Sequence, residues 1–200
     1  KWLSEKIKLE NTSEDQTNWM EINPSDLNQI SYGDLQFLCL EGTGSSAEVY
    51  HCSYNGQDIA VKVPKFNMYA VTNRLEDMME HKREIAIMSQ LSSPYVVQFC
   101  GVSPDQGRFL MVMEYMPNSL KTLLRSENCP SEKTRYLMAI RISKGIAYLH
   151  SIEPPYKKRV IHGDLKDANI LLDSEFKPKI TDFGRAKLMG EKDAPNLGTI

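Results

Sequence analysis

Two neighbouring stretches decide the fold: His162-Gly163-Asp164-Leu165-Lys166-Asp167-Ala168-Asn169 and Asp182-Phe183-Gly184. Each stretch follows a short apolar run, so its polar groups are expected in a loop at the end of a strand. Asp164 can accept a proton from an attacking hydroxyl group, and Lys166 can balance the charge of a phosphoryl group. Asn169 and Asp182 offer oxygen atoms of the kind that Mg²⁺ binds. Together these four groups indicate a site for phosphate chemistry.

A glycine-bearing segment lies earlier in the chain, at Gly42-Thr43-Gly44-Ser45-Ser46-Ala47-Glu48-Val49. Because glycine has no Cβ, Gly42 and Gly44 allow backbone amides to approach phosphate oxygens closely. No Gly-Lys-Ser/Thr follows, so this is not a Walker-type loop. A strand rather than a helix comes next, which excludes a dinucleotide-binding fingerprint. Taken alone, the segment also fits an ordinary hairpin turn.

Lys62 lies inside an apolar run, Ile59-Ala60-Val61-Lys62-Val63, and points to the face opposite its two valine neighbours. Burying an ammonium group is costly unless an anion meets it. Glu84 is a candidate anion, because it shares one helical face with Met88 and Leu91 at i, i+4 and i+7 spacing. We therefore predict a Lys62–Glu84 pair, although each residue alone also fits a solvated surface charge.

The bulk composition is that of an ordinary globular domain, with 41% hydrophobic and 25% charged residues among 200 and a net charge of −2. No basic excess suggests a nucleic-acid partner, and no apolar run reaches membrane-spanning length. The cysteines, Cys39, Cys52, Cys100 and Cys129, have no CxxC spacing and no pair at a zinc-like interval from a histidine. Free thiols are typical of a reducing compartment, so we expect a cytoplasmic protein. The sequence does not indicate an oligomeric state.

Local patterns predict a β-rich half followed by a helix-rich half, and hence the α+β class. Strands are expected at 35–40, 49–52, 59–63, 96–102 and 108–115, with Asn55-Gly56 as a hairpin turn. Helices are expected at 71–91, 119–124 and 132–150, and short strands at 160–161, 170–172 and 179–180. A capped turn that opens into a short helix is expected at 23–27.

With these motifs assembled, the sequence from about Leu35 to Ile200 resembles the protein kinase family. The signature of that family is a Gly-rich loop, a strand lysine, a catalytic loop and Asp-Phe-Gly. The resemblance implies a bilobal fold, with a five-stranded antiparallel N-lobe sheet, one N-lobe helix and a mainly helical C-lobe that is incomplete here. It implies an N-terminal extension at 1–34, the N-lobe and hinge at 35–116, and a partial C-lobe at 117–200 that ends in the activation segment.

The resemblance also assigns site residues. Those implied to contact ATP are Gly42, Thr43, Gly44, Val49, Ala60, Lys62, Met113, Glu114, Met116 and Leu171. Those implied to be catalytic are Asp164, Lys166, Lys62 and Glu84, with Asn169 and Asp182 as ligands of Mg²⁺. Met113 would be the gatekeeper, and 114–116 the hinge whose backbone holds the adenine edge. An apolar stack that couples the lobes would consist of Phe99, Met88, Phe183 and His162.

Two further matches concern the subgroup. Lys166 follows the serine/threonine pattern, because tyrosine kinases usually carry Arg or Ala there, and Gly198-Thr199 is similar to the Gly-Thr of serine/threonine kinases. The run that begins at Trp19 resembles the tyrosine-kinase-like group and is expected to dock on the domain. The implied activity is transfer of the γ-phosphate of Mg-ATP to Ser/Thr hydroxyls of protein substrates. The alternatives are a pseudokinase, acting as a nucleotide-binding scaffold or switch, and a small-molecule kinase.

The sequence departs from the family pattern at four places. Ala47 replaces the third loop glycine, and Arg185 follows Asp-Phe-Gly where an apolar residue is usual. Gly163 replaces an Arg that normally pairs with a phosphate on the activation loop, so we expect activity that does not depend strongly on loop phosphorylation. The sequence stops at Ile200, inside the activation segment, which we interpret as a piece of a longer chain.

Overall fold

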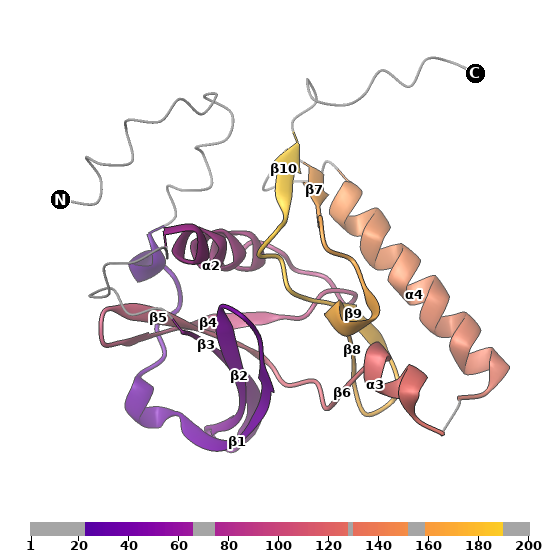
Figure 1. Ribbon diagram of the computed structural model, residues 1–200, viewed down its shortest axis with the longest axis horizontal. Helices are drawn as coiled ribbons and strands as arrows, with labels where there is room; N and C mark the ends of the chain where they lie inside the picture. The colour runs from indigo at the N-terminus through magenta and orange to yellow at the C-terminus, as the bar shows by residue number, and fades with distance from the viewer. Residues whose placement is uncertain (1–22, 66–74, 128–129, 152–158, 190–200) are drawn as a thin grey trace.

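The computed structural model describes residues 23–65, 75–127, 130–151 and 159–189. Its larger sheet is antiparallel, with five strands in the order β1-β2-β3-β5-β4. The strands are β1 (Gln36–Thr43), β2 (Ala47–Tyr54), β3 (Gln57–Pro64), β4 (Phe99–Asp105) and β5 (Arg108–Glu114). Helix α2 (Leu75–Met88) runs along one side of this sheet (Figure 1). The expected five-stranded N-lobe sheet with one helix is confirmed.

Two tight turns set the register of this sheet. In the β2–β3 hairpin, Asn55 and Gly56 have φ angles of 51° and 76°, and both therefore lie in the left-handed region. This is the turn that Asn-Gly predicts, because its twist matches that of the flanking strands. Gln106 and Gly107 adopt the same conformation in the β4–β5 hairpin, with φ angles of 44° and 81°. The sequence analysis did not identify that second turn.

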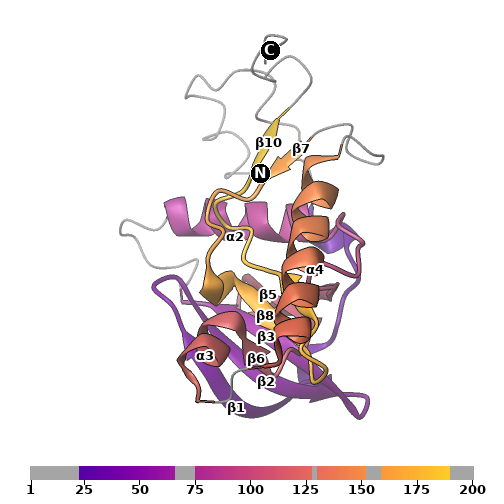
Figure 2. The same cartoon turned by 90° about the vertical axis from the view of Figure 1, so that its right-hand side faces the viewer.

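In the described residues from 118 to 189, the second part of the chain holds two α-helices and five short strands. They are β6 (Asn118–Ser119), α3 (Leu120–Arg125), α4 (Glu132–His150), β7 (Arg159–Ile161), β8 (Ile170–Leu172), β9 (Pro178–Ile180) and β10 (Lys187–Met189). Both helices begin at a serine cap: the hydroxyl oxygens of Ser119 and Ser131 accept hydrogen bonds from the amides of Thr122 and Thr134. Figure 2 shows α4 alongside the small β6-β8-β9 sheet.

The main apolar core joins the two parts. It contains residues of α2, β5, α4, β8 and β9, including Met88, Met111, Leu149, Ile170 and Ile180. Backbone hydrogen bonds fix the same junction, since the amide of Val97 donates to Ile180 O at 2.9 Å. The loop that follows β9 therefore emerges next to both the sheet and α2.

Four expectations need correction or lie outside the described part. The strand expected at 96–102 begins at Phe99, because Val96 instead forms an isolated bridge to Ile180. The helix expected at 71–91 ends at Met88, where the chain turns with i to i−3 hydrogen bonds, and 71–74 lie outside the described residues. By contrast, the capped turn and short helix expected at 23–27 are confirmed, because Pro24–Asp26 form a 3₁₀ helix and the amide of Ser25 donates to Asn23 Oδ1 at 3.1 Å. Trp19 and Thr199 lie outside the described residues.

The end of the 1–34 region is packed on the larger sheet. The amide of Ile30 donates to Val102 O at 2.8 Å, and the amide of Val102 donates to Asn28 O at 2.9 Å. Ile30 is buried in a second apolar cluster, together with Leu35 and Val61. This segment is therefore part of the first lobe's core. Within the described residues, no helix has the length and apolar character required to cross a membrane.

Candidate active site

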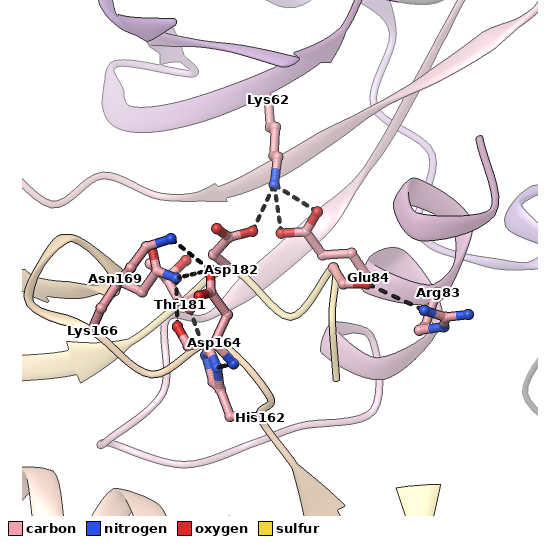
Figure 3. A network of polar contacts seen from close by, with 10 residues as sticks. Lys62, Arg83, Glu84, His162, Asp164, Lys166, Asn169, Thr181 and Asp182 are labelled. Carbon is pink, nitrogen blue, oxygen red and sulfur yellow. Dashed lines mark hydrogen bonds and ion pairs between the residues drawn. The ribbon is translucent and has the colours of Figure 1, made fainter. Parts of the chain in front are cut away.

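Lys62 on β3 holds two carboxylates. Its Nζ lies 2.8 Å and 2.6 Å from the two carboxylate oxygens of Glu84, and 3.3 Å from Asp182 Oδ1 (Figure 3). Strand alternation explains the direction of this side chain, because Val61 on one side of it is buried in the opposite core. Glu84 is only 3% exposed on α2. The predicted Lys62–Glu84 pair is confirmed.

Burial and charge oppose each other in this cluster. Burial alone would lower the pKa of Lys62, but the carboxylates of Glu84 and Asp182 outweigh it and raise that pKa. Burial raises the pKa of Glu84, the charge of Lys62 opposes the rise, and the charge of Asp182 adds to it. One cation therefore serves two carboxylates, which leaves a net negative charge where a metal cation could bind.

Asp182 occupies a strained backbone position. Its φ angle is 67°, in the left-handed region that non-glycine residues rarely adopt. Such a conformation costs about 1–3 kcal/mol and persists only where the surrounding structure enforces it. Phe183, the next residue, is fully buried in the main core, and this burial holds the turn in place. The carboxylate of Asp182 thereby reaches Lys62, while its side chain remains 42% exposed.

The catalytic loop brings Asp164, Lys166 and Asn169 together. Lys166 Nζ lies 2.6 Å from Asp164 Oδ2, and Asn169 Nδ2 donates to Asp164 O at 2.9 Å and to Asp164 Oδ2 at 3.2 Å. The hydrogen bond from Lys166 lowers the pKa of Asp164, and burial opposes that shift less strongly. Both side-chain hydrogen bonds from Lys166 and Asn169 converge on the Oδ2 oxygen of Asp164.

His162 supports this loop from below. Its Nε2 lies 2.9 Å from Thr181 O, and its Nδ1 lies 3.3 Å from the amide of Asp164. A carbonyl only accepts and an amide only donates, so both contacts are satisfied by the Nε2–H tautomer. The imidazole ring also packs on Phe183, with 4.9 Å between the ring centroids. Met88 and Phe183 belong to the same core cluster, against which Phe99 packs, as the implied apolar stack requires.

Gly163 and Arg185, two of the departures noted in the sequence, touch each other. Gly163 has a φ angle of 76°, and a Cβ added there would lie 2.6 Å from Arg185 O. The carbonyl of Arg185 thus occupies the space that a side chain at position 163 would need. The positive charge of Arg185 also lowers the pKa of Asp164, as the smallest of several causes. Gly163 therefore allows the segment after Asp-Phe-Gly to lie directly against the catalytic loop.

The residues implied to contact ATP gather on the adjoining strands. Val49 lies opposite Lys62 on β2 and β3, and Ala60 lies opposite Met113 on β3 and β5. Gly42 and Thr43 end β1, where Gly42 lies opposite Val49, and Gly44 is in the turn that follows. Met116 is buried in the main core, and Leu171 on β8 packs against that core.

Glu114, at the implied hinge, has a side chain held by two hydrogen-bonding partners. The side chain of Glu114 is held by Lys179, whose Nζ lies 2.7 Å from both carboxylate oxygens, and by the amide of Gln98 at 2.7 Å. The hinge contact implied by the resemblance is made by the backbone of Glu114, and these side-chain contacts leave that expectation unchanged. Sequence reasoning missed Lys179, because it lies 65 positions away and no local pattern links it to the hinge.

In the described residues, the larger of two hollows is not the one lined by the charged site residues. The one lined by Lys62, Glu84 and Asp182 has a volume of only about 30 Å³, because these side chains fill it. A larger hollow of about 370 Å³ lies on the other face of the sheet, next to Tyr50 and Arg108. Since none of the predicted site residues lines it, we locate the active site by its charged groups rather than by volume.

Comparisons with known proteins agree with this geometry. A receptor-like serine/threonine-protein kinase of Arabidopsis thaliana is 38% identical over 158 residues, covering 76% of this chain and 23% of that protein. A receptor-like cytosolic serine/threonine-protein kinase of the same plant is 36% identical, covering 75% and 31%. A dual specificity protein kinase of Dictyostelium discoideum is 33% identical, covering 74% and 19%.

The chain therefore spans about a third or less of the length of these relatives. The protein kinase domain pattern itself matches residues 37–199, which include the glycine loop, Lys62, the catalytic loop and Asp-Phe-Gly. On this match and on the assembled site, the chain belongs to the protein kinase family.

Proposed function

We propose that the protein is a serine/threonine kinase that transfers the γ-phosphate of ATP to hydroxyl groups of protein substrates. The observation that carries the proposal is the shared ion pair in which Lys62 joins Glu84 of α2 and Asp182 of the Asp-Phe-Gly turn. These groups come from three separate elements, and they are assembled as phosphoryl transfer requires. Two relatives are named as serine/threonine kinases, which supports Ser/Thr as the acceptor residues. Because another is named as a dual specificity kinase, the experiment below also looks for phosphotyrosine.

In this proposal each group has one role. Lys62, held by Glu84, binds the α- and β-phosphates. Asp164 orients the substrate hydroxyl and accepts its proton as the oxygen attacks the γ-phosphorus and the bond to the leaving oxygen breaks. Lys166 offsets the charge on the transferred group. Because the pKa of Asp164 is lowered, it is a weak base, and its main contribution is orientation.

The site fits Mg²⁺. Asn169 uses its amide NH₂ group on Asp164, so its carbonyl oxygen remains as a ligand, and Asp182 shares its only described cation with Glu84. Oxygen ligands of this kind are those that Mg²⁺ prefers. When bound, Mg²⁺ would supply positive charge across the β- and γ-phosphates.

The surroundings of the active protein are also proposed. The cysteines among the described residues, Cys39, Cys52 and Cys100, are free thiols, and one relative is named as cytosolic. Both facts support a cytoplasmic signalling enzyme. The subgroup match around Lys166 supports placing it with the tyrosine-kinase-like group.

The decisive experiment is transfer of labelled γ-phosphate from Mg-ATP to a protein mixture, followed by identification of the labelled amino acid. Asp164→Asn should lower the rate by about 10²–10⁴-fold, and Lys62→Met should abolish the reaction. Lys133→Met, at an exposed lysine of α4, is the matched control and should retain activity. Label found on tyrosine alone would refute the proposed specificity for serine and threonine. ATP binding without transfer would favour the pseudokinase alternative.

A further inference from the structure

Three side chains with different metal-binding atoms meet beside the hinge. Cys39 and Glu41 lie on β1, and His51 lies opposite Cys39 on β2. One ligand atom from each lies within 4.8 Å of the others. Cys39 Sγ is 3.6 Å from Glu41 Oε1, and His51 Nδ1 is 4.0 Å from the same oxygen. A register shift between Leu40 and Gly42 leaves Glu41 next to the pair.

The imidazole of His51 is held in a fixed orientation. Its Nε2 lies 2.7 Å from Asp58 Oδ1, and an ionised carboxylate can only accept a hydrogen bond. Nε2 therefore donates to Asp58, and in that tautomer the lone pair of Nδ1 faces Glu41. The ring of Tyr115 stacks on the imidazole at 3.8 Å with an interplanar angle of 9°, which prevents it from turning.

Glu41 is held as well. The hydroxyl of Tyr115 donates to Glu41 Oε1 at 2.8 Å. An imidazole lone pair, a carboxylate oxygen and a sulfur atom thus face one another across a few ångströms. Ligands of protein-bound metals typically have such outer partners, a carboxylate on the far nitrogen of the histidine and a hydrogen bond on the ligating carboxylate. Asp58 and Tyr115 are these partners.

We propose that Cys39, Glu41 and His51 form a binding site for Zn²⁺. Zinc bonds of about 2.0–2.3 Å in a tetrahedron place ligand atoms about 3.3–3.8 Å apart. Two of the three separations, 3.6 Å and 4.0 Å, are near that range and the third is within 4.8 Å, so side-chain movements can close the site. Thiolate and imidazole ligands favour zinc over magnesium, which prefers oxygen alone. Three protein ligands leave a fourth position for water or another ligand.

This site lies next to the nucleotide cleft but is not part of it. Glu41 immediately precedes Gly42, and His51 lies opposite Ala60 on β3. Through Tyr115, which follows Glu114 in the hinge, the cluster also contacts the segment implied to hold adenine. A bound Zn²⁺ would therefore fix the start of the glycine loop to the hinge. The site does not depend on the phosphotransfer proposal, because none of its three metal ligands has a role in that proposal.

The test measures metal content directly. Chelator-treated protein is dialysed against Zn²⁺ with excess Mg²⁺, and Co²⁺ is then used as a spectroscopic probe of thiolate ligation. We expect one zinc equivalent and a thiolate-to-cobalt absorption band, both lost in Cys39→Ser and in His51→Gln. Asp58→Asn should weaken binding about 10–100-fold. Cys100→Ser, which removes a thiol of β4 outside the cluster, is the matched control and should keep both signals.

Two results would overturn the proposal: no stoichiometric zinc in the wild-type protein, or zinc and the cobalt band unchanged in Cys39→Ser. Thermal unfolding of each variant without metal checks that the fold is retained. If Cys39→Ser does not fold, Glu41→Gln takes its place, because the exposed Glu41 carboxylate can lose its charge with little change of shape. Unchanged zinc binding in that variant would count equally against the site.

Discussion

Acidification should destabilise the protein through His81. This residue lies on α2, one turn before Glu84, and is 8% exposed. Burial, opposed by its hydrogen bond to Phe109 O and assisted by the charge of Lys62, lowers the pKa of His81 to about 4. In the unfolded chain the imidazole takes up a proton near pH 6.5, whereas in the folded protein it does so only near pH 4. Between about pH 4 and pH 6.5 the unfolded state therefore binds more protons than the folded state.

The magnitude follows from that difference. One pKa unit corresponds to about 1.4 kcal/mol, so lowering the pH from 7.5 to 5.0 should remove about 2 kcal/mol of unfolding free energy. For a chain of this size that is a fall of about 4–8 °C in Tm. The acidic residues of α2 that line the same hollow, Asp77, Glu80 and Glu84, are the groups that could offset part of the loss.

The assay is urea unfolding at the two pH values in wild type and in His81→Gln. Glutamine can still donate to Phe109 O but cannot gain a charge, so the variant should lose most of the pH dependence. His150→Gln, which replaces an exposed histidine at the end of α4, controls for the loss of one imidazole. If wild type were equally stable at both pH values, or if His81→Gln kept the full difference, the reasoning would be refuted.

Three other predictions follow from the site. Glu84→Gln removes one partner of a buried ion pair, so it should lower the free energy of unfolding in urea by about 3 kcal/mol and remove most of the phosphotransfer activity. Retained stability and activity would show that Asp182 alone is a sufficient partner for Lys62. Gly163→Ala should cost more stability than Gly56→Ala, because both have a φ angle of 76° but only the first meets Arg185; equal losses would mean that strain alone matters. Phosphatase treatment should leave most of the kinase activity, and near-complete loss would contradict the expected independence from loop phosphorylation.

The elements that could be predicted are those with local causes. Helix α4 spans the expected residues, because Ser131 caps it and its apolar positions have helical spacing. The β2–β3 turn follows from Asn55-Gly56, since few other residue pairs adopt two left-handed conformations. The loops around Asp164 and Asp182 were recognisable because their chemistry is concentrated in a few consecutive residues.

What could not be predicted depends on residues far apart in the chain. The anchor of Glu114 on Lys179 joins two strands, and the meeting of Cys39 with His51 depends on a strand register with a shift in it. Each of these residues, taken alone, is compatible with a solvated surface position. Strand β10 is short and, among the residues that the structure describes, pairs with β7 alone, so its local sequence carries little signal.

The contact between Gly163 and Arg185 limits which residues position 163 can accept. An arginine placed at position 163 would meet the backbone carbonyl of Arg185, which fills the volume that its side chain needs. The main chain after Asp-Phe-Gly would have to take another path first. An arginine at position 163 could therefore be accommodated only through coordinated changes in two loops, the catalytic loop and the segment after Asp-Phe-Gly.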